Sequence, residues 1–262
     1  MRLNHLRKGS GEPLLLVHGL GSQYQVWQPV IDRLAEEREV IGIDLPGFGD
    51  SAPLPDDGTP SAGELTVAVE EFLDGIGWER PHVAGSSLGG WIGLELAKRG
   101  RARSVTAIGS AGFANPRERL FTVDSLRANR AVARLLHRPA RLLLRGPLRR
   151  KLLLSQVFGH PERMTTEAAV ETLRNLADSP GAPGALEALR QGHFSGGAQI
   201  DVPVTMAWGD RELLLPRRTR QAERSIRAVP GARLVWLRDC GHVPTWDDPD
   251  QVARVILETT RR

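Results

Sequence analysis

The sequence contains a single cysteine, Cys240, which excludes an intramolecular disulfide and a metal site made of several cysteines. We expect this residue to be a packed thiol. Long apolar runs are absent too, because none reaches the roughly 18 continuous residues that a membrane-spanning helix needs. The first apolar run, Leu14 to Val17, is also too short for the core of a secretory signal. These absences predict a protein without a membrane span, located in the cytoplasm.

Lysine and tyrosine are scarce as well. The chain has 35 basic and 31 acidic residues, a net charge of +4, yet only Lys8, Lys98 and Lys151 are lysines. It has one tyrosine, and no basic segment is interleaved with aromatic residues. No nucleic-acid-binding module is recognisable. We therefore expect no nucleic-acid partner.

What is present has the composition of a globular α/β protein. Hydrophobic residues make up 40% and charged residues 25% of the 262 positions, enough for one large domain with a sizeable core. Short apolar runs, typical of strands buried on both faces, alternate with helical patterns such as the capping box Ser61 to Glu64. The runs are 14–17, 40–43, 82–84, 104–108, 202–208 and 233–237. This alternation predicts a mostly parallel, doubly wound sheet.

The alternation stops in the stretch 112–199, which is rich in leucine and arginine and has no convincing strand. Prolines divide this stretch into short helices: Pro116, Pro139, Pro147, Pro161 and Pro180. We interpret it as a helical cap inserted into a core formed by 1–111 and 200–262. Ligands of open α/β sheets bind at the carboxyl ends of the strands, so such an insertion is expected to shape the ligand cleft.

Arginines recur in this stretch at steps of three or four, the spacing of one helical face. They are Arg127, Arg130, Arg134, Arg138, Arg141, Arg145 and Arg149. The favoured interpretation is a solvated, amphipathic face of the cap, interrupted at Pro139. The alternatives are a surface that attracts anionic substrates and a surface that contacts a membrane.

The strongest chemical motif is Gly85-Ser86-Ser87-Leu88-Gly89, which lies between a buried strand and a helical pattern. Gly-x-Ser-x-Gly in this context is typical of a nucleophile elbow. A serine held in a strained backbone conformation needs neighbours without side chains two positions away. The motif predicts Ser87 as the nucleophile. It also places the Leu88 amide at a helix N-terminus, where it could stabilise a developing oxyanion.

These features resemble the α/β-hydrolase superfamily, in particular its small capped members such as carboxylesterases and carbon–carbon bond hydrolases. Besides the elbow, His18-Gly-Leu-Gly21 is similar to the family's oxyanion loop, and the turn from Asp44 to Ser51 is similar to its characteristic turn after the next strand. The resemblance implies that the Leu20 amide is the second oxyanion donor. His18 is expected to hold that loop by hydrogen bonding. Asp44 is expected to brace its turn, although it also closes a strand and is therefore a weaker alternative for the catalytic acid.

The resemblance also implies an acid and a base. Asp210, after the late strand 202–208, matches the family's acid position, whereas Glu212 is expected to be solvated. Of the seven histidines, His242 follows the last strand and matches the family's Gly-His motif, completing the order Ser, Asp, His. We therefore predict a catalytic triad of Ser87, Asp210 and His242 that needs no cofactor or metal.

The leading functional hypothesis is hydrolysis of a carboxylic ester, or of a lactone or thioester, through an acyl-enzyme on Ser87. One alternative is a carbon–carbon hydrolase acting on a vinylogous diketo acid, which would also need a cation to hold the substrate acid. Another is a ligand receptor that kept the fold without catalysis. The serine disfavours haloalkane dehalogenases and epoxide hydrolases, which carry aspartate at the elbow. The partners expected are a small ester-like molecule and water, and the sequence leaves the physiological substrate, the stereochemical preference and the oligomeric state open.

Overall fold

The computed structural model describes residues 1–55 and 60–262. Its centre is a seven-stranded sheet with the order β1-β3-β2-β4-β5-β6-β7. All neighbouring strands are parallel except β1 and β3, which confirms the predicted mostly parallel sheet. The strands are β1 (His5–Lys8), β2 (Glu12–Val17), β3 (Arg38–Ile43), β4 (His82–Ser86), β5 (Ser104–Ile108), β6 (Val204–Gly209) and β7 (Arg233–Leu237).

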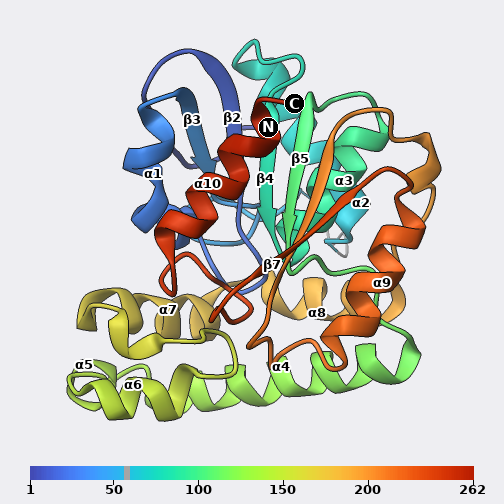
Figure 1. Ribbon diagram of the computed structural model, residues 1–262. Coiled ribbons are helices and arrows are strands. Elements are labelled where there is room, and N and C mark those ends of the chain that lie inside the picture. The colour runs from blue at the N-terminus through green and yellow to red at the C-terminus, as the bar shows by residue number, and fades with distance from the viewer. Residues whose placement is uncertain (56–59) are drawn as a thin grey trace.

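Helices cover both faces of the sheet, as a doubly wound fold requires (Figure 1). One face packs against α1 (Gln28–Ala35), which follows the 3₁₀ turn η1 (Tyr24–Trp27), and against α10 (Pro249–Thr260). The other face packs against α2 (Ala62–Gly75), α3 (Leu88–Lys98) and α9 (Arg218–Ala228). The expected capping box at Ser61 is present, since its side chain accepts from the Glu64 amide while Glu64 accepts from the Ser61 amide.

The six predicted strands are all present, with ends that differ by at most two residues. The sequence did not reveal β1, an antiparallel edge strand of four residues of which three are exposed. An edge strand with little buried surface carries no apolar run, so no hydrophobic pattern marks it.

Between β5 and β6 the chain forms helices only, and they lie beyond the carboxyl ends of the central strands (Figure 1). They are α4 (Pro116–Leu136), α5 (Ala140–Leu143), α6 (Pro147–Leu154), α7 (Thr166–Asp178) and α8 (Ala182–Gln191), with 3₁₀ turns η2 (Pro161–Arg163) and η3 (Gly197–Gln199). We call residues 112–199 the cap segment, and its separation from the core as a domain stays a prediction. Among the helices described here, none is long and apolar enough to cross a membrane.

The arginines of the cap segment do not share one helical face. The chain leaves α4 at Leu136, and the seven predicted positions are spread over α4, α5, α6 and their connections. Arg130 is buried and donates from Nη2 to the carbonyl of Ser179 at 2.8 Å, and Nε of Arg134 donates to the carbonyl of Ala177. These two side chains therefore join α4 to the end of α7, while the others stay exposed.

Candidate active site

Ser87 lies in the tight turn between β4 and α3. Its backbone has φ 55° and ψ −114°, a region that residues with a side chain rarely adopt. The two flanking glycines are needed for steric reasons. A Cβ on Gly85 would lie 2.1 Å from the Gly89 carbonyl oxygen, and one on Gly89 would lie 2.2 Å from that of Val17. The packing therefore accounts for the Gly-x-Ser-x-Gly spacing, and it keeps Ser87 at the end of the sheet.

The loop after β2 runs directly past this serine. A Cβ on Gly19 would lie 3.0 Å from the Cβ of Ser87, so the backbone of this loop approaches the Ser87 side chain closely, and a larger residue than glycine would crowd it. Leu88 is the first residue of α3, where helical geometry leaves the amide without an intrahelical acceptor. The two predicted oxyanion donors, Leu20 and Leu88, therefore belong to segments on either side of Ser87.

His18 holds the loop in place through both ring nitrogens. Nδ1 is 2.7 Å from the Gly19 carbonyl, and Nε2 accepts from the Leu45 amide at 2.9 Å. Because a carbonyl can only accept and an amide can only donate, the ring is neutral with its proton on Nδ1. Burial lowers the pKa of His18, against the opposing effects of the Gly19 hydrogen bond and the Asp44 charge. His18 therefore has the structural role that the sequence suggested.

This lowered pKa predicts that acid destabilises the fold. Below about pH 6.5 the unfolded chain binds a proton at His18, whereas the folded chain does not until its own lower pKa is reached. The free energy of unfolding should therefore fall as pH decreases from about 6.5, and His82, whose pKa is also lowered by burial, adds to the same trend. Urea unfolding of the wild type and of His18→Asn across this range measures the effect. The variant should lose less stability on acidification, and an equal loss would exclude His18 as a source.

Asp44 braces the neighbouring turn, as expected. Its buried carboxylate accepts hydrogen bonds from Nδ2 of Asn4 and from the amides of Tyr24 and Asp50, at 2.8 to 3.0 Å. A Cβ on Gly49 would lie 2.1 Å from the same carboxylate. Asp44 therefore connects three segments around the loop after β2, and the carboxylate that contacts His242 is a different one.

The histidine contact corrects the predicted acid. Nδ1 of His242 lies 2.6 Å from Oε2 of Glu212, and Glu212 is only 2% exposed. Asp210, the predicted acid, has an exposed side chain. The expectation that Glu212 is solvated was therefore wrong, and Asp210 is not placed to orient the imidazole. The ring nitrogen donates in this contact because a carboxylate only accepts.

Glu212 is held rigidly in this position. Its other oxygen, Oε1, accepts from the amides of Leu214 at 2.7 Å and Leu215 at 2.9 Å. The backbone after β6 also remains hydrogen-bonded to the end of β7 and the residues after it. The amide of Asp210 donates to the carbonyl of Leu237, and the amide of Arg211 donates to that of Cys240. Because of this pairing, the chain after β6 reaches His242 at Glu212, two residues later than Asp210. No local sequence signal distinguishes Asp210 from Glu212, because the delay depends on contacts between distant segments.

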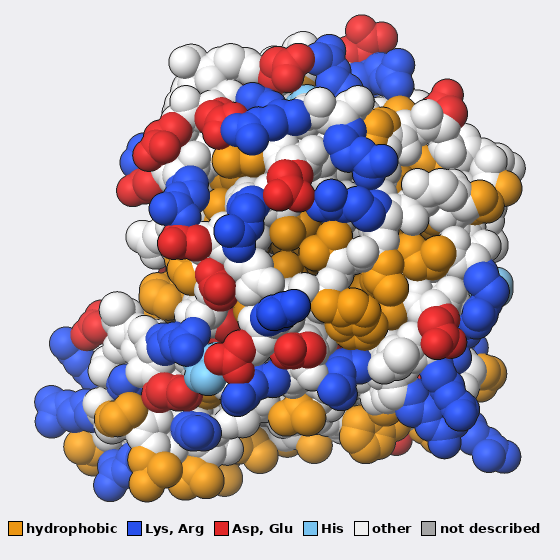
Figure 2. All heavy atoms as spheres, in the orientation of Figure 1, with side chains coloured by type: hydrophobic (Ala, Val, Ile, Leu, Met, Phe, Trp, Pro, Cys, Tyr) orange, Lys and Arg blue, Asp and Glu red, His pale blue; other side chains and the backbone are white. Residues whose placement is uncertain are grey.

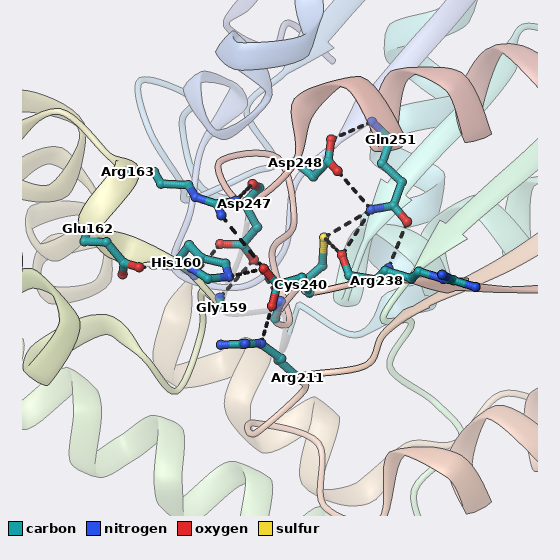
Figure 3. Close-up of polar contacts among 12 residues, drawn as sticks. Gly159, His160, Glu162, Arg163, Arg211, Arg238, Cys240, Asp247, Asp248 and Gln251 are labelled. Carbon is teal, nitrogen blue, oxygen red and sulfur yellow. Dashed lines mark hydrogen bonds and ion pairs between the residues drawn. The ribbon is translucent and has the colours of Figure 1, made fainter.

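The loop that carries His242 is anchored by Asp247, which is 2% exposed (Figure 3). The Asp247 carboxylate accepts from the amides of Gly159, His160 and Gly241, at 2.7 to 2.9 Å. Two of these donors belong to the cap segment and one precedes His242. A single buried carboxylate therefore fixes the His242 loop and the cap segment to each other, a role that the sequence did not reveal.

A second, more exposed group reinforces this junction (Figure 3). His160 lies between two carboxylates, with Nδ1 2.9 Å from Glu162 and Nε2 2.6 Å from Asp239. Arg211 pairs with the other oxygen of Asp239 at 2.5 Å. Burial alone would raise the pKa of Asp239, but the His160 hydrogen bond and the nearby positive charges lower it overall. The junction therefore favours an ionised Asp239.

Cys240 is buried next to this loop, and its thiol contacts the carbonyl of Arg238 at 3.2 Å. Burial, together with surrounding carboxylates, raises the pKa of Cys240 to about 12. The thiol therefore stays protonated at neutral pH, as expected for a packed side chain without a nucleophilic role.

Ser87 and His242 line one cavity, which has about 690 Å³ of space, part of it open to solvent. The cap segment closes it with apolar side chains that include Leu126, Phe158 and Leu176. A second cavity also reaches Ser87, with about 450 Å³ of space that likewise includes open solvent. In the described part of the chain no hydrogen bond joins Oγ of Ser87 to the imidazole. Such bonds are often long without substrate, so both side chains remain candidates for one reaction centre.

The second cavity differs from the first in having an arginine side chain on its wall. Arg119 and Gln221 line it together with apolar residues of the cap segment and core. Nε of Arg119 and Oε1 of Gln221 are both buried without a hydrogen-bond partner among the residues described. Unsatisfied buried polar groups are costly, and a polar part of a ligand could satisfy them.

Comparison with known proteins agrees with this fold. Residues 14–255 match the model of the alpha/beta hydrolase family. The chain therefore belongs to this family of hydrolases, whose members act on small molecules with water. The structure resembles that of a thermophilic esterase from Thermogutta terrifontis, with a TM-score of 0.76, 22% sequence identity, and coverage of 99% of this chain and 93% of the other. At this identity the likeness concerns the fold.

Two curated relatives are similar over almost the whole chain. A pimeloyl-[acyl-carrier protein] methyl ester esterase from Aromatoleum aromaticum is 30% identical over 263 residues, which cover 95% of this chain and 98% of the relative. The dihydrolipoyllysine-residue acetyltransferase component of the acetoin cleaving system from Cupriavidus necator is 30% identical over 261 residues, or 93% of this chain. The match covers only 62% of that second relative's length.

Proposed function

We propose that this hydrolase cleaves a carboxylic ester, or a related lactone or thioester, through an acyl-enzyme on Ser87. In this proposal His242 is the general base and Glu212 the acid that orients it. The observation that carries the proposal is the placement of a strained Ser87 and a buried, carboxylate-paired His242 on the wall of one apolar cavity. The similarity to a methyl ester esterase supports the ester class.

Each of these groups has a part in the proposed reaction, and the contacts of His242 support the order of the steps. Because Nδ1 of His242 donates to Glu212, Nε2 is the nitrogen left to accept the Ser87 proton. Oγ of Ser87 then attacks the carbonyl carbon, and the carbonyl oxygen becomes negative between the amides of Leu20 and Leu88. His242 returns the proton to the leaving alkoxide. Water, deprotonated by the same nitrogen, releases the acid and restores Ser87.

The cavity that the cap segment lines with apolar side chains predicts a preference for esters of short to medium acyl chains over long-chain triglycerides. A pocket covered by the cap segment limits acyl length and excludes water. Turnover of p-nitrophenyl esters of increasing chain length measures this, and kcat/KM should pass through a maximum and then fall. Best activity on emulsified long-chain substrates would contradict the proposed covered pocket. A parallel panel of lactones, thioesters and diketo acids identifies the bond that is cleaved.

A second candidate, hydrolysis of a carbon–carbon bond in a vinylogous diketo acid, is favoured by Arg119. This candidate needs a cation for the substrate carboxylate, and Arg119 lines the cavity that also reaches Ser87. It predicts faster turnover of esters with a distal carboxylate than of neutral esters, an advantage that salt should reduce. Arg119→Gln should lower the ratio of the two rates by about tenfold, since a charged hydrogen bond is lost. An unchanged ratio would leave the neutral ester as the substrate class.

A further inference from the structure

The helices α4, α5 and α6 expose large apolar side chains on the outside of the molecule. The exposed fractions are 78% for Leu135, 60% for Leu142, 68% for Leu148 and 76% for Leu152. Figure 2 shows hydrophobic side chains gathered along the lower edge of the molecule, over these helices, with Lys and Arg side chains beside them. We call these four leucines and the cations Arg138, Arg141, Arg145, Arg149 and Lys151 the outer cap face.

The exposure follows from the helix geometry. Leu135, Leu142 and Leu152 each lie two positions from a residue that is buried in the cap segment, namely Ala133, Ala140 or Leu144, and Leu154. Two positions correspond to roughly 200° around an α-helix, so burial of one side requires that the other side face outward. The leucines therefore do not belong to the core of the cap segment, and nothing in the described structure covers them.

The part of the cap segment that carries most of the outer cap face, residues 125–161, has charge of one sign. Residues 125–161 contain nine arginines and lysines and no aspartate or glutamate. The nine positive charges of residues 125–161 exceed the net charge of the whole chain, which is +4. The remainder of the chain is therefore net negative. Arg130 and Arg150 are buried, where they donate to backbone carbonyls of the cap segment. The five cations of the outer cap face are exposed, and none forms a salt bridge within the part of the chain that the structure describes.

We propose that the outer cap face binds the surface of a membrane that contains anionic lipids. Exposed leucines next to unpaired arginines are the features of an amphipathic surface that places its apolar side chains among lipid tails and its cations at the headgroups. The inner side of α4, with Val123 and Leu126, lines the cavities that reach Ser87. Binding would therefore bring the catalytic cavity next to the lipid surface, from which apolar esters can enter.

Charge and composition favour this partner over the others. A symmetric contact with a second copy would place the same cations against one another, which is repulsive. A nucleic acid would neutralise the cations but leave the leucines in water. It would also find no base-stacking platform here, because the one aromatic residue of 125–161, Phe158, is buried. An anionic bilayer can bury the leucines among its lipid tails and pair the cations with its headgroups.

Vesicle flotation tests the proposal with the whole protein and phosphatidylcholine vesicles with or without phosphatidylglycerol. We expect binding only to the anionic vesicles, and weaker binding at high salt. Two variants divide the surface: Leu135→Ser with Leu152→Ser removes apolar burial in the lipid, and Arg141→Gln with Arg145→Gln removes attraction to the headgroups. Each should weaken binding by about tenfold or more, because each removes two side chains that stabilise the bound state. The matched charge control, Arg220→Gln with Arg227→Gln on α9, should bind like the wild type.

Unchanged thermal unfolding and unchanged turnover of a water-soluble ester show that a variant is folded. The proposal is overturned if the protein does not bind the anionic vesicles or binds both vesicle types equally. It is also overturned if the leucine variant binds like the wild type, because the charge would then attract any polyanion, including an acidic protein. Loss of self-association in the leucine variant, without vesicle binding, would assign the surface to a second copy. Vesicle binding does not require turnover, so failure of the proposed ester hydrolysis leaves this test valid.

Discussion

Ser87→Ala is expected to reduce ester turnover by about a millionfold. Removal of a base-activated serine abolishes the covalent route, and comparable triad nucleophiles show losses of this order. Only backbone amides and binding would remain to accelerate the reaction. Turnover of a p-nitrophenyl ester, measured with wild type and variant at equal concentrations, gives the ratio directly.

Labelling with a fluorophosphonate provides an independent measurement, because the probe reacts with an activated serine and needs no substrate. The wild type should be labelled at Ser87, and Ser87→Ala should not be labelled. The adjacent Ser86→Ala is the matched control and should keep its label, since the hydroxyl of Ser86 is buried and has no partner in the described structure. A label on another residue, or undiminished turnover in Ser87→Ala, would contradict the assignment.

Glu212→Gln should reduce turnover by about 10⁴-fold, the order seen when the orienting acid of a serine–histidine pair is changed to its amide. The amide keeps the shape of the side chain, but it removes the charge that stabilises the imidazolium and offers a donor where His242 already donates. Asp210→Asn is the decisive comparison. Its side chain is exposed, so turnover should stay within a few-fold of the wild type.

The two variants together distinguish the carboxylates. If Asp210→Asn were the inactive variant and Glu212→Gln the active one, the acid would be Asp210, and the observed pairing of His242 with Glu212 would not be the catalytic one. Unfolding in urea is the control for both, because Glu212 also accepts two amides of its own loop. A fall in turnover that exceeds any fall in folded fraction is the expected result for Glu212→Gln.

The expected loss in Glu212→Gln depends on a contact that only the tertiary structure decided. Both carboxylates follow β6, and their spacing alone cannot select one, because the choice depends on how far the backbone remains paired with the segment after β7. The same holds for Asp247, which joins Gly159 and His160 to the His242 loop across nearly 90 residues of sequence. Long-range contacts of this kind leave no periodicity to detect. The edge strand β1 and the contacts of Arg130 and Arg134 with the end of α7 were also decided at this level.

The sequence by itself determined the alternation of strands and helices, the elbow around Ser87 and the position of His242 after the last strand. These features are encoded locally: buried strands require apolar runs, and a close turn requires glycine at Gly85 and Gly89. The tertiary structure decided which carboxylate meets His242, which side chains form the cavities and which leucines remain exposed. Each of these depends on the packing of segments that are far apart in the chain. In the case of the acid, two more residues of backbone pairing place Glu212 against His242 in place of Asp210.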